Sequence, residues 1–150
     1  MTQDILVRVG EEYFIKNALD GDTFTIGLYN DSTDNIVDGD NLSNITTEPT
    51  NGNYSRQSIT VSTDNIDSGG DWGIENDAAF DFDFTDVAPG DGDDITVDSG
   101  FWVANFQSEE EGDGSATDNL IGTFALTQNR ETGQIDSLRI EAGDAEFTLD

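Results

Sequence analysis

Residues 79–87 read Ala-Phe-Asp-Phe-Asp-Phe-Thr-Asp-Val and alternate between apolar and polar side chains. The side-chain period of a β-strand is two, so the three phenylalanines fall on one side of an extended chain and Asp81, Asp83 and Thr85 on the other. This pattern predicts a half-buried strand. A disordered acidic tail lacks such ordered aromatic spacing, and we therefore expect a folded protein despite the polar composition.

Similar alternating segments recur along the chain, separated by turn residues at spacings of roughly 8–12 residues. This pattern is typical of an all-β antiparallel sandwich or a closed barrel. A parallel α/β fold is excluded, because no helical segments separate the strands. We expect further strands over residues 22–29, 54–63, 101–106, 120–126, 135–140 and 145–149, and short strands at 72–74 and 95–97.

One short helix is expected, over residues 10–19. Glu11 and Glu12 lie in its first turn, where acidic side chains favour the helix dipole, and Gly21 lies where a C-terminal cap would be. We therefore divide the chain into an N-terminal arm and helix, residues 1–21, and a single β-sandwich domain, residues 22–150. A domain of this size buries about 68–70% of its unfolded surface, which supports a core without disulfides or metals.

A long polar connection rich in Asn, Asp, Thr and Gly occupies residues 30–53, and Arg56 follows it at the start of a strand. An arginine surrounded by carboxylates favours a bidentate ion pair. We expect Arg56 to fix this connection to the sandwich through such a pair, with a subunit contact as the second interpretation.

The charge is strongly one-sided: 33 acidic residues stand against five basic ones, giving a formal charge of −28. Of the acids, 23 are aspartate, and Lys16 is the single lysine. In molar salt the Debye length falls to about 3 Å, and most of the resulting repulsion disappears. The composition resembles that of proteins from extreme halophiles. An acidic mesophilic protein and a protein with a basic partner are the alternatives, and direct binding of nucleic acid is not expected.

The composition also narrows the chemistry. The chain has no histidine and no cysteine, which excludes Ser-His-Asp triads, cysteine nucleophiles and His-ligated zinc. A pair of carboxylates could still hydrolyse glycosides. With 33 acidic residues in the chain, however, the sequence does not distinguish a catalytic pair from any other. We expect no enzymatic activity and no cofactor. No apolar run approaches the ~20 residues that span a membrane, and no secretory signal is expected.

Oxygen ligands for a cation are abundant. The best candidates are Asp91, Asp93 and Asp94, in a turn after Pro89. Residues 109–120 imitate a calcium loop in their first half, but Leu120 stands where a bidentate glutamate is required. We treat the three aspartates as a loose cation site, with halophilic loop acidity as the alternative.

Two further features are open to a functional interpretation. Trp72 and Trp102 could form a platform for stacking sugars, although both lie inside strand patterns that favour core packing. Four Asn-x-Ser/Thr sequons fall in the polar connection, which is compatible with a glycosylated surface; they begin at Asn30, Asn41, Asn44 and Asn53.

Several motifs occur in a telling order: Gly-Leu-Tyr-Asn at 27–30, Leu-Ser-Asn-Ile-Thr-Thr-Glu-Pro at 42–49, Asn-Tyr-Ser-Arg-Gln at 53–57, Gly-Phe-Trp-Val-Ala-Asn-Phe at 100–106 and Phe-Thr-Leu at 147–149. This order resembles small virion structural proteins of tailed viruses. The resemblance implies a jelly-roll or related β-sandwich. With the acidic composition, it implies a protein of a haloarchaeal tailed virus.

The resemblance implies a non-enzymatic capsid decoration, or cement, protein on the surface of the virion in a hypersaline environment. Its partners would be the major capsid protein and further copies of itself, with a homotrimer favoured and a pentamer as the alternative. The arm and helix, which carry Arg8 and Lys16, are the expected docking element, unless they simply cap one end of the sandwich. A vertex turret or tail protein contacting the host surface is one alternative. A glycan-binding or carbohydrate-active β-sandwich is another.

Overall fold

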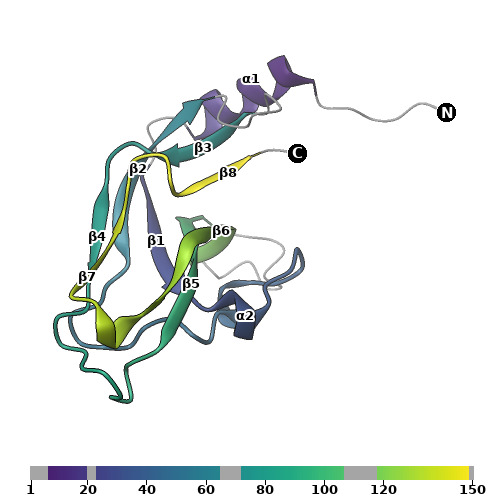
Figure 1. The fold of residues 1–150 in the computed structure, drawn as a ribbon. Coiled ribbons are helices and arrows are strands. Elements are labelled where there is room, and N and C mark those ends of the chain that lie inside the picture. The colour runs from purple at the N-terminus through teal and green to yellow at the C-terminus, as the bar shows by residue number, and fades with distance from the viewer. Residues whose placement is uncertain (1–6, 20–22, 65–71, 107–117, 149–150) are drawn as a thin grey trace.

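The computed structural model describes residues 7–19, 23–64, 72–106 and 118–148, with backbone alone at 62–64 and 147–148. A helix lies at one end of a body of strands (Figure 1). The helices and 3-10 turns are α1 (Arg8–Ala18), α2 (Asp31–Asp34), η1 (Leu42–Asn44) and η2 (Thr132–Gln134). The strands are β1 (Thr23–Tyr29), β2 (Gln57–Asp64), β3 (Gly73–Asn76), β4 (Phe80–Asp83), β5 (Thr96–Asn105), β6 (Asp118–Glu131), β7 (Ser137–Ile140) and β8 (Glu146–Thr148).

The strands are arranged as one large sheet and one small one, and every pairing is antiparallel. Six strands follow the order β6-β5-β1-β2-β3-β8, and β4 pairs with β7 separately. The large sheet curls, so that its two edge strands, β6 and β8, approach each other. The all-β antiparallel class expected from the sequence is confirmed.

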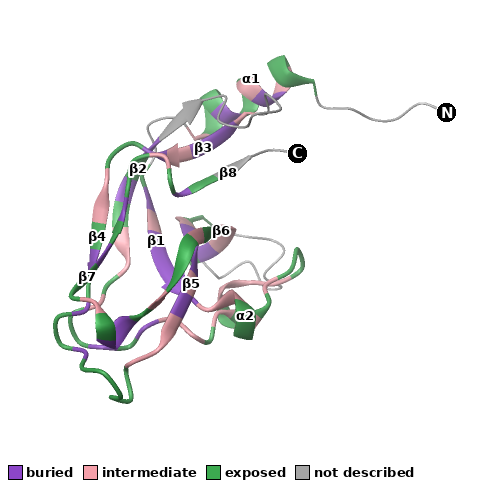
Figure 2. Ribbon diagram, viewed as in Figure 1, coloured by how far each residue is buried: buried purple, intermediate pink, exposed green. Residues whose placement is uncertain are grey.

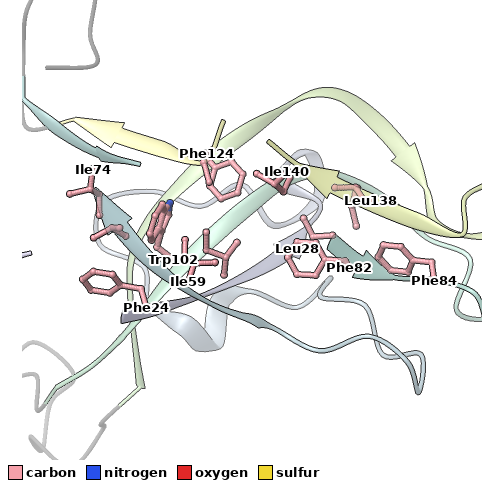
Figure 3. Packing of buried hydrophobic residues seen from close by; sticks show 14 of the residues in the cluster. Phe24, Leu28, Ile59, Ile74, Phe82, Phe84, Trp102, Phe124, Leu138 and Ile140 are labelled. Atoms are coloured by element: carbon pink, nitrogen blue, oxygen red, sulfur yellow. The ribbon is translucent and has the colours of Figure 1, made fainter. Parts of the chain in front are cut away.

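One hydrophobic core joins the two sheets. Phe82 and Phe84, at the end of β4, and Leu138 and Ile140 of β7 are buried against residues of the large sheet such as Leu28 (Figure 3). The β4–β7 pair therefore covers part of one face of the curled sheet. A smaller buried cluster around Tyr29, Phe101 and Val103 lies under the polar connection.

Several of the expected strands have different bounds, and two of these differences are informative. The alternation at 79–87 continues as strand only to Asp83, because the Asp83 carboxylate then accepts hydrogen bonds from the backbone N–H and the hydroxyl of Thr85 and turns the chain. The segments at 95–97 and 101–106, expected as two strands, form the single strand β5. The polar residues that suggested a break, Asp98 to Gly100, remain in the strand.

The helical segments agree with expectation at the N-terminus and differ from it in the polar connection, residues 30–53. The expected helix at 10–19 is confirmed as α1, which begins at Arg8. The polar connection, in which the sequence predicts no helix, also contains α2 and η1. The Asn30 side chain caps α2 by accepting from the Thr33 N–H, and Asn41 and Asn44 form a reciprocal capping box around η1.

Candidate docking surface

Helix α1 is attached to the body by a few specific contacts. Ile15 is buried, with 2% of its surface exposed. The buried Glu11 carboxylate accepts a hydrogen bond of 3.1 Å from the Trp72 N–H, and the Lys16 Nζ lies 5.0 Å from the centroid of the Trp72 ring. These contacts define the inner side of the helix and fix its outer side toward solvent.

The outer side of α1 is apolar. Val9, Tyr13 and Phe14 are 74%, 64% and 56% exposed, and Val7, the residue before the helix, is 62% exposed. Elsewhere among the described residues, only Val37 and Phe106 are large hydrophobic side chains with comparable exposure. Figure 2 shows exposed segments along α1 beside its buried ones. We call the surface formed by Val7, Val9, Tyr13 and Phe14 the α1 patch.

Helical geometry explains why the patch faces away from the body. Residues three or four apart share a helix face, so the buried Glu11 and Ile15 form one stripe and Val9 and Tyr13 form another, nearly opposite. The rings of Tyr13 and Phe14 contact edge to face, with centroids 5.7 Å apart. An amphipathic helix normally turns its apolar stripe inward, and α1 leaves most of its large apolar side chains outside.

The predicted role of Arg56 is confirmed. Its Nε donates a hydrogen bond to Oε1 of Glu48, in the polar connection, and its Nη2 donates one to Oε2; both are 2.8 Å long. The guanidinium also lies 5.1 Å from the centroid of the Phe101 ring in β5. The Tyr54 hydroxyl donates to the Glu48 carboxylate and accepts from the Leu28 N–H of β1. The ion pair therefore fixes the connection to the sheet.

This cluster is built for rigidity. The Tyr54 ring stacks on Phe82 and Phe84, with centroids 5.6 and 6.0 Å away. Burial and the neighbouring Glu48 carboxylate raise the pKa of the Tyr54 hydroxyl well above its usual range. The hydroxyl therefore stays protonated and keeps donating its hydrogen bond, which makes it a structural group and a poor general base.

Carboxylates organise the rest of the connection. Asp34 accepts hydrogen bonds from the backbone N–H groups and hydroxyls of Thr46 and Thr47. Asp98 accepts from the N–H groups of Asp31 and Ser32 and from the Ser32 hydroxyl. Partial burial opposes ionisation of both carboxylates, but the hydrogen bonds outweigh it and lower the pKa of each below its ordinary value. These aspartates act as structural acceptors.

The three aspartates predicted as a cation site, Asp91, Asp93 and Asp94, also act as hydrogen-bond acceptors. Asp91 and Asp94 accept hydrogen bonds from the N–H groups of Ala88 and Gly90, and Asp94 also accepts from the Gly133 N–H. The Asp93 carboxylate accepts from the Thr50 hydroxyl. Within the described part of the chain, no three acidic residues gather closely enough to hold a metal ion. The imitation calcium loop at 109–120 lies mostly outside the described residues.

The two tryptophans do not form a common exposed platform. Trp102 is 0% exposed and contacts Phe24 in the core, whereas Trp72 is half-buried beneath Lys16. Of the four sequon asparagines, Asn53 is exposed and donates to the Thr85 hydroxyl, and the other three cap helical turns. Trp102 and the capping asparagines therefore have structural roles in the fold.

Sequence reasoning proposed α1 as the docking element but did not identify its exposed apolar residues. The spacing of the helix residues carried this information. Glu11 and Ile15 lie four residues apart and share the buried face, which leaves Val9 and Tyr13 on the opposite face.

Comparison with models of protein families, with curated proteins and with solved structures found no match. Among the described helices, none has the length and apolar character needed to cross a bilayer.

Proposed function

We propose that the protein is a non-enzymatic virion component, a capsid decoration protein that stabilises the head of a tailed virus in a hypersaline environment. The α1 patch is the observation that carries this proposal. The patch gathers four exposed apolar side chains, whereas the other exposed residues in the described part of the chain are mostly polar or acidic, and such a patch marks an interaction site.

The proposed partner of the α1 patch is the major capsid protein. Aromatic residues such as Tyr13 and Phe14 supply large contact areas at low cost in conformational entropy, as interface anchors do. Arg8 and Lys16, two of the five basic residues, lie on the same helix. Lys16 is engaged by Glu12 and the Trp72 ring, but the exposed Arg8 favours a partner surface that combines an apolar pocket with carboxylates at its rim.

The rigid body behind α1 suits a mechanical role. A decoration protein acts by many weak contacts repeated over a symmetric lattice, and multivalency makes the sum strong. We propose a homotrimer on the capsid surface as the binding unit. Glu48, Asp34 and Asp98 hold the polar connection in place through hydrogen bonds. We expect these contacts to help the protein keep its shape under mechanical load.

The finer fold in this proposal is a jelly-roll β-sandwich. The described residues form eight antiparallel strands, and the packing of the β4–β7 pair across a curled sheet supports a sandwich. A jelly roll in its usual form is a double sheet of eight strands, whereas the eight strands here divide six and two. An experimental structure of the assembled particle would decide between a jelly roll and another Greek-key sandwich.

The function is tested by reconstitution of undecorated heads with purified protein in molar salt. The wild-type chain is expected to bind at threefold positions and to raise the temperature at which heads rupture. Removal of residues 1–9, or the double change Tyr13→Ser and Phe14→Ser, is expected to abolish binding. The matched control is Val37→Ser, which removes an exposed hydrophobic side chain away from α1.

Two results would contradict the proposal. Normal head occupancy by the Tyr13→Ser, Phe14→Ser variant would remove the docking role of the patch. Binding of wild-type protein only at fivefold positions would instead assign it to a vertex turret.

A further inference from the structure

A small groove of about 270 Å³ lies between β6 and the chain that follows α2. Ile36 and Leu120 line this groove and also pack against the smaller buried cluster under the polar connection. Val37 lines it too but is 60% exposed, so the groove joins a buried apolar surface to an exposed one. We call it the Val37 groove. Its apolar lining residues are Ile36, Val37, Leu120 and Ile121, its acidic ones are Asp38 and Asp40, and the uncharged Gly122 and Thr123 complete it.

The turn that carries Val37 is held by hydrogen bonds. The Val37 N–H donates to the Asp40 carboxylate at 2.8 Å, and the Asp40 N–H donates to the Val37 carbonyl at 2.9 Å. Val37 therefore stays exposed in a fixed position. A contact that covers it removes apolar surface from water without first having to order the loop.

Charge restricts what can approach the Val37 groove. Among the described residues, Asp38 and Asp40 are the only charged ones in its lining, and the exposed Asp38 carboxylate accepts no hydrogen bond from the described residues. The groove therefore favours a partner that brings an apolar group together with positive charge. With 33 acids against five basic residues, most of the surface of a second copy carries the wrong charge.

The N-terminal end of α1 is the exception. The exposed Arg8 forms no ion pair within the described part of the chain, whereas three of the other four basic residues pair with a carboxylate and the fourth, Arg130, is half-buried. The sequence neighbours of Arg8 on both sides belong to the α1 patch. Of the two acids of α1, Glu11 is buried and Glu12 pairs with Lys16. This end of the helix therefore offers exposed apolar side chains and a guanidinium together.

We propose that the Val37 groove receives the α1 patch of a second copy of the chain. An aromatic side chain of the patch, from Tyr13 or Phe14, enters the groove and covers Val37. An apolar cavity of about 150 Å³ accommodates a benzene ring, so the groove has room for one such side chain. Arg8 pairs with the Asp38 carboxylate beside it.

The occupant has to come from another copy. Figure 1 shows α1 beyond one end of the strands, far from α2 and the chain that follows it. Two different surfaces meet, so the contact is heterologous and can join copies into a ring or a chain. In the absence of heads the α1 patch is thus covered, and the capsid protein of the proposed function competes for it. The inference does not depend on that function, because self-association is measured without heads.

Sedimentation equilibrium of the full chain in molar KCl, where the Debye length is about 3 Å, tests this inference. Wild-type protein is expected to associate as its concentration rises. Val37→Glu, which places a charge in the apolar contact, and the double change Tyr13→Ser, Phe14→Ser are each expected to weaken association by about tenfold or more. Ser137→Glu is the matched control for Val37→Glu, since it adds the same charge at an exposed position outside both surfaces, and it is expected to leave association unchanged.

A mixture of the two weakened variants distinguishes this contact from the pairing of like surfaces. The Val37→Glu chain keeps an intact α1 patch, and the Tyr13→Ser, Phe14→Ser chain keeps an intact groove. Their equimolar mixture is expected to form heterodimers with about wild-type affinity, at concentrations where each variant alone stays monomeric.

Charge exchange tests the pairing of Arg8 with Asp38. Arg8→Asp is expected to weaken association, and adding Asp38→Arg in the same chain is expected to restore it, because the guanidinium and the carboxylate then exchange sides of the contact. A double variant that associates no better than Arg8→Asp would overturn this pairing.

If Val37→Glu loses its native circular dichroism, Val37→Ser replaces it, with a smaller expected weakening. Wild-type protein that stays monomeric, a Val37→Glu protein that associates as strongly as wild type, or a mixture of the two variants that stays monomeric would each overturn the inference. Loss of head binding with the expected pattern of self-association would count only against the decoration function.

Discussion

The guanidinium of Arg56 is held by two hydrogen bonds to Glu48 and lies against Phe101, and its side chain is 32% exposed. Lysine cannot make the two parallel hydrogen bonds or stack as a plane. We expect Arg56→Lys to destabilise the fold by about 1–3 kcal/mol, the range for hydrogen bonds to charged groups. Chemical denaturation in molar salt measures the free energy of unfolding.

A double-mutant cycle with Glu48→Gln separates the pair from its surroundings. The two single changes are expected to cost more in sum than the double change costs, because each leaves the same interaction broken. Strict additivity would mean that Arg56 acts through Phe101 alone.

Asp34 supplies part of the pH dependence expected of this fold. Its pKa in the folded protein lies below the ordinary value of 3.8. Its stabilising contribution is therefore fully present above about pH 4 and is lost as the pH falls through the lower, folded-state pKa. We expect the free energy of unfolding to fall as the pH drops below about 4 in molar salt, and Asp34→Asn to reduce that fall.

High salt is essential to the pH measurement, because protonation in dilute buffer also relieves the repulsion among 33 acids. Asp38→Asn is the matched control, since Asp38 is exposed and its carboxylate accepts no hydrogen bond from the described residues. A pH profile that is identical for Asp34→Asn and wild type would refute the structural role of this carboxylate.

At the residue scale, the sequence predicted a role where a residue type is rare and failed where it is common. Arg56 is one of five basic residues, and its acidic partner was therefore foreseeable. Asp34 and Asp98 are two of 23 aspartates, and nothing in the sequence separates them from solvated ones. Their roles depend on threonine and backbone donors that only the folded connection brings near.

At the scale of the elements, α1 combines a buried and an exposed face that respond differently to substitution. Ile15→Ala removes a buried side chain and is expected to cost about 2–4 kcal/mol. Tyr13→Ser with Phe14→Ser alters exposed positions and is expected to change stability by about 0.5 kcal/mol or less per site. Thermal unfolding compares the two variants. Equal destabilisation would mean that Tyr13 and Phe14 also pack against the body.

The sheet contains glycines that aromatic rings of the neighbouring strand cover. Gly27 pairs with Phe101, and Gly100 pairs with Phe124. A Cβ atom added to Gly100 would lie 2.2 Å from the Phe124 ring. We expect Gly100→Ala to destabilise the protein by about 1–3 kcal/mol through overpacking, as measured by thermal unfolding.

Gly39→Ala is the control for this change, since no atom lies within 4 Å of a Cβ at that position. A Gly100→Ala protein as stable as Gly39→Ala would show that the Phe124 ring moves aside without strain.

Strand pattern predicted most of the sheet because alternation reflects the pleat directly. It failed at β5, where Asp98, Ser99 and Gly100 look like a break. Asp98 holds α2, and Gly100 lies under Phe124, so both are explained by neighbours distant in sequence. Pattern also could not show that β4 and β7 form their own pair, because pairing partners are set by the folded core.

For the whole molecule, the formal charge of −28 predicts that the stability of the fold depends on salt. A homotrimer of such chains would carry about three times that charge, and it is credible only where salt screens it. We expect subunits to dissociate or unfold below about 1 M salt, where the Debye length exceeds about 3 Å. Circular dichroism and light scattering across a KCl titration measure both events, and a stable trimer in dilute buffer would contradict the halophilic interpretation.

Screening can be separated from specific cation binding by a matched set of variants. Asp38→Asn, Asp77→Asn and Asp136→Asn together lower the charge from −28 to −25 at exposed positions. If repulsion sets the transition, the triple change should move its midpoint to lower salt, and KCl and MgCl₂ should act alike at equal ionic strength. If cations bind between Asp91, Asp93 and Asp94, Mg²⁺ should protect at a much lower ionic strength, and the triple change should leave the midpoint where it was.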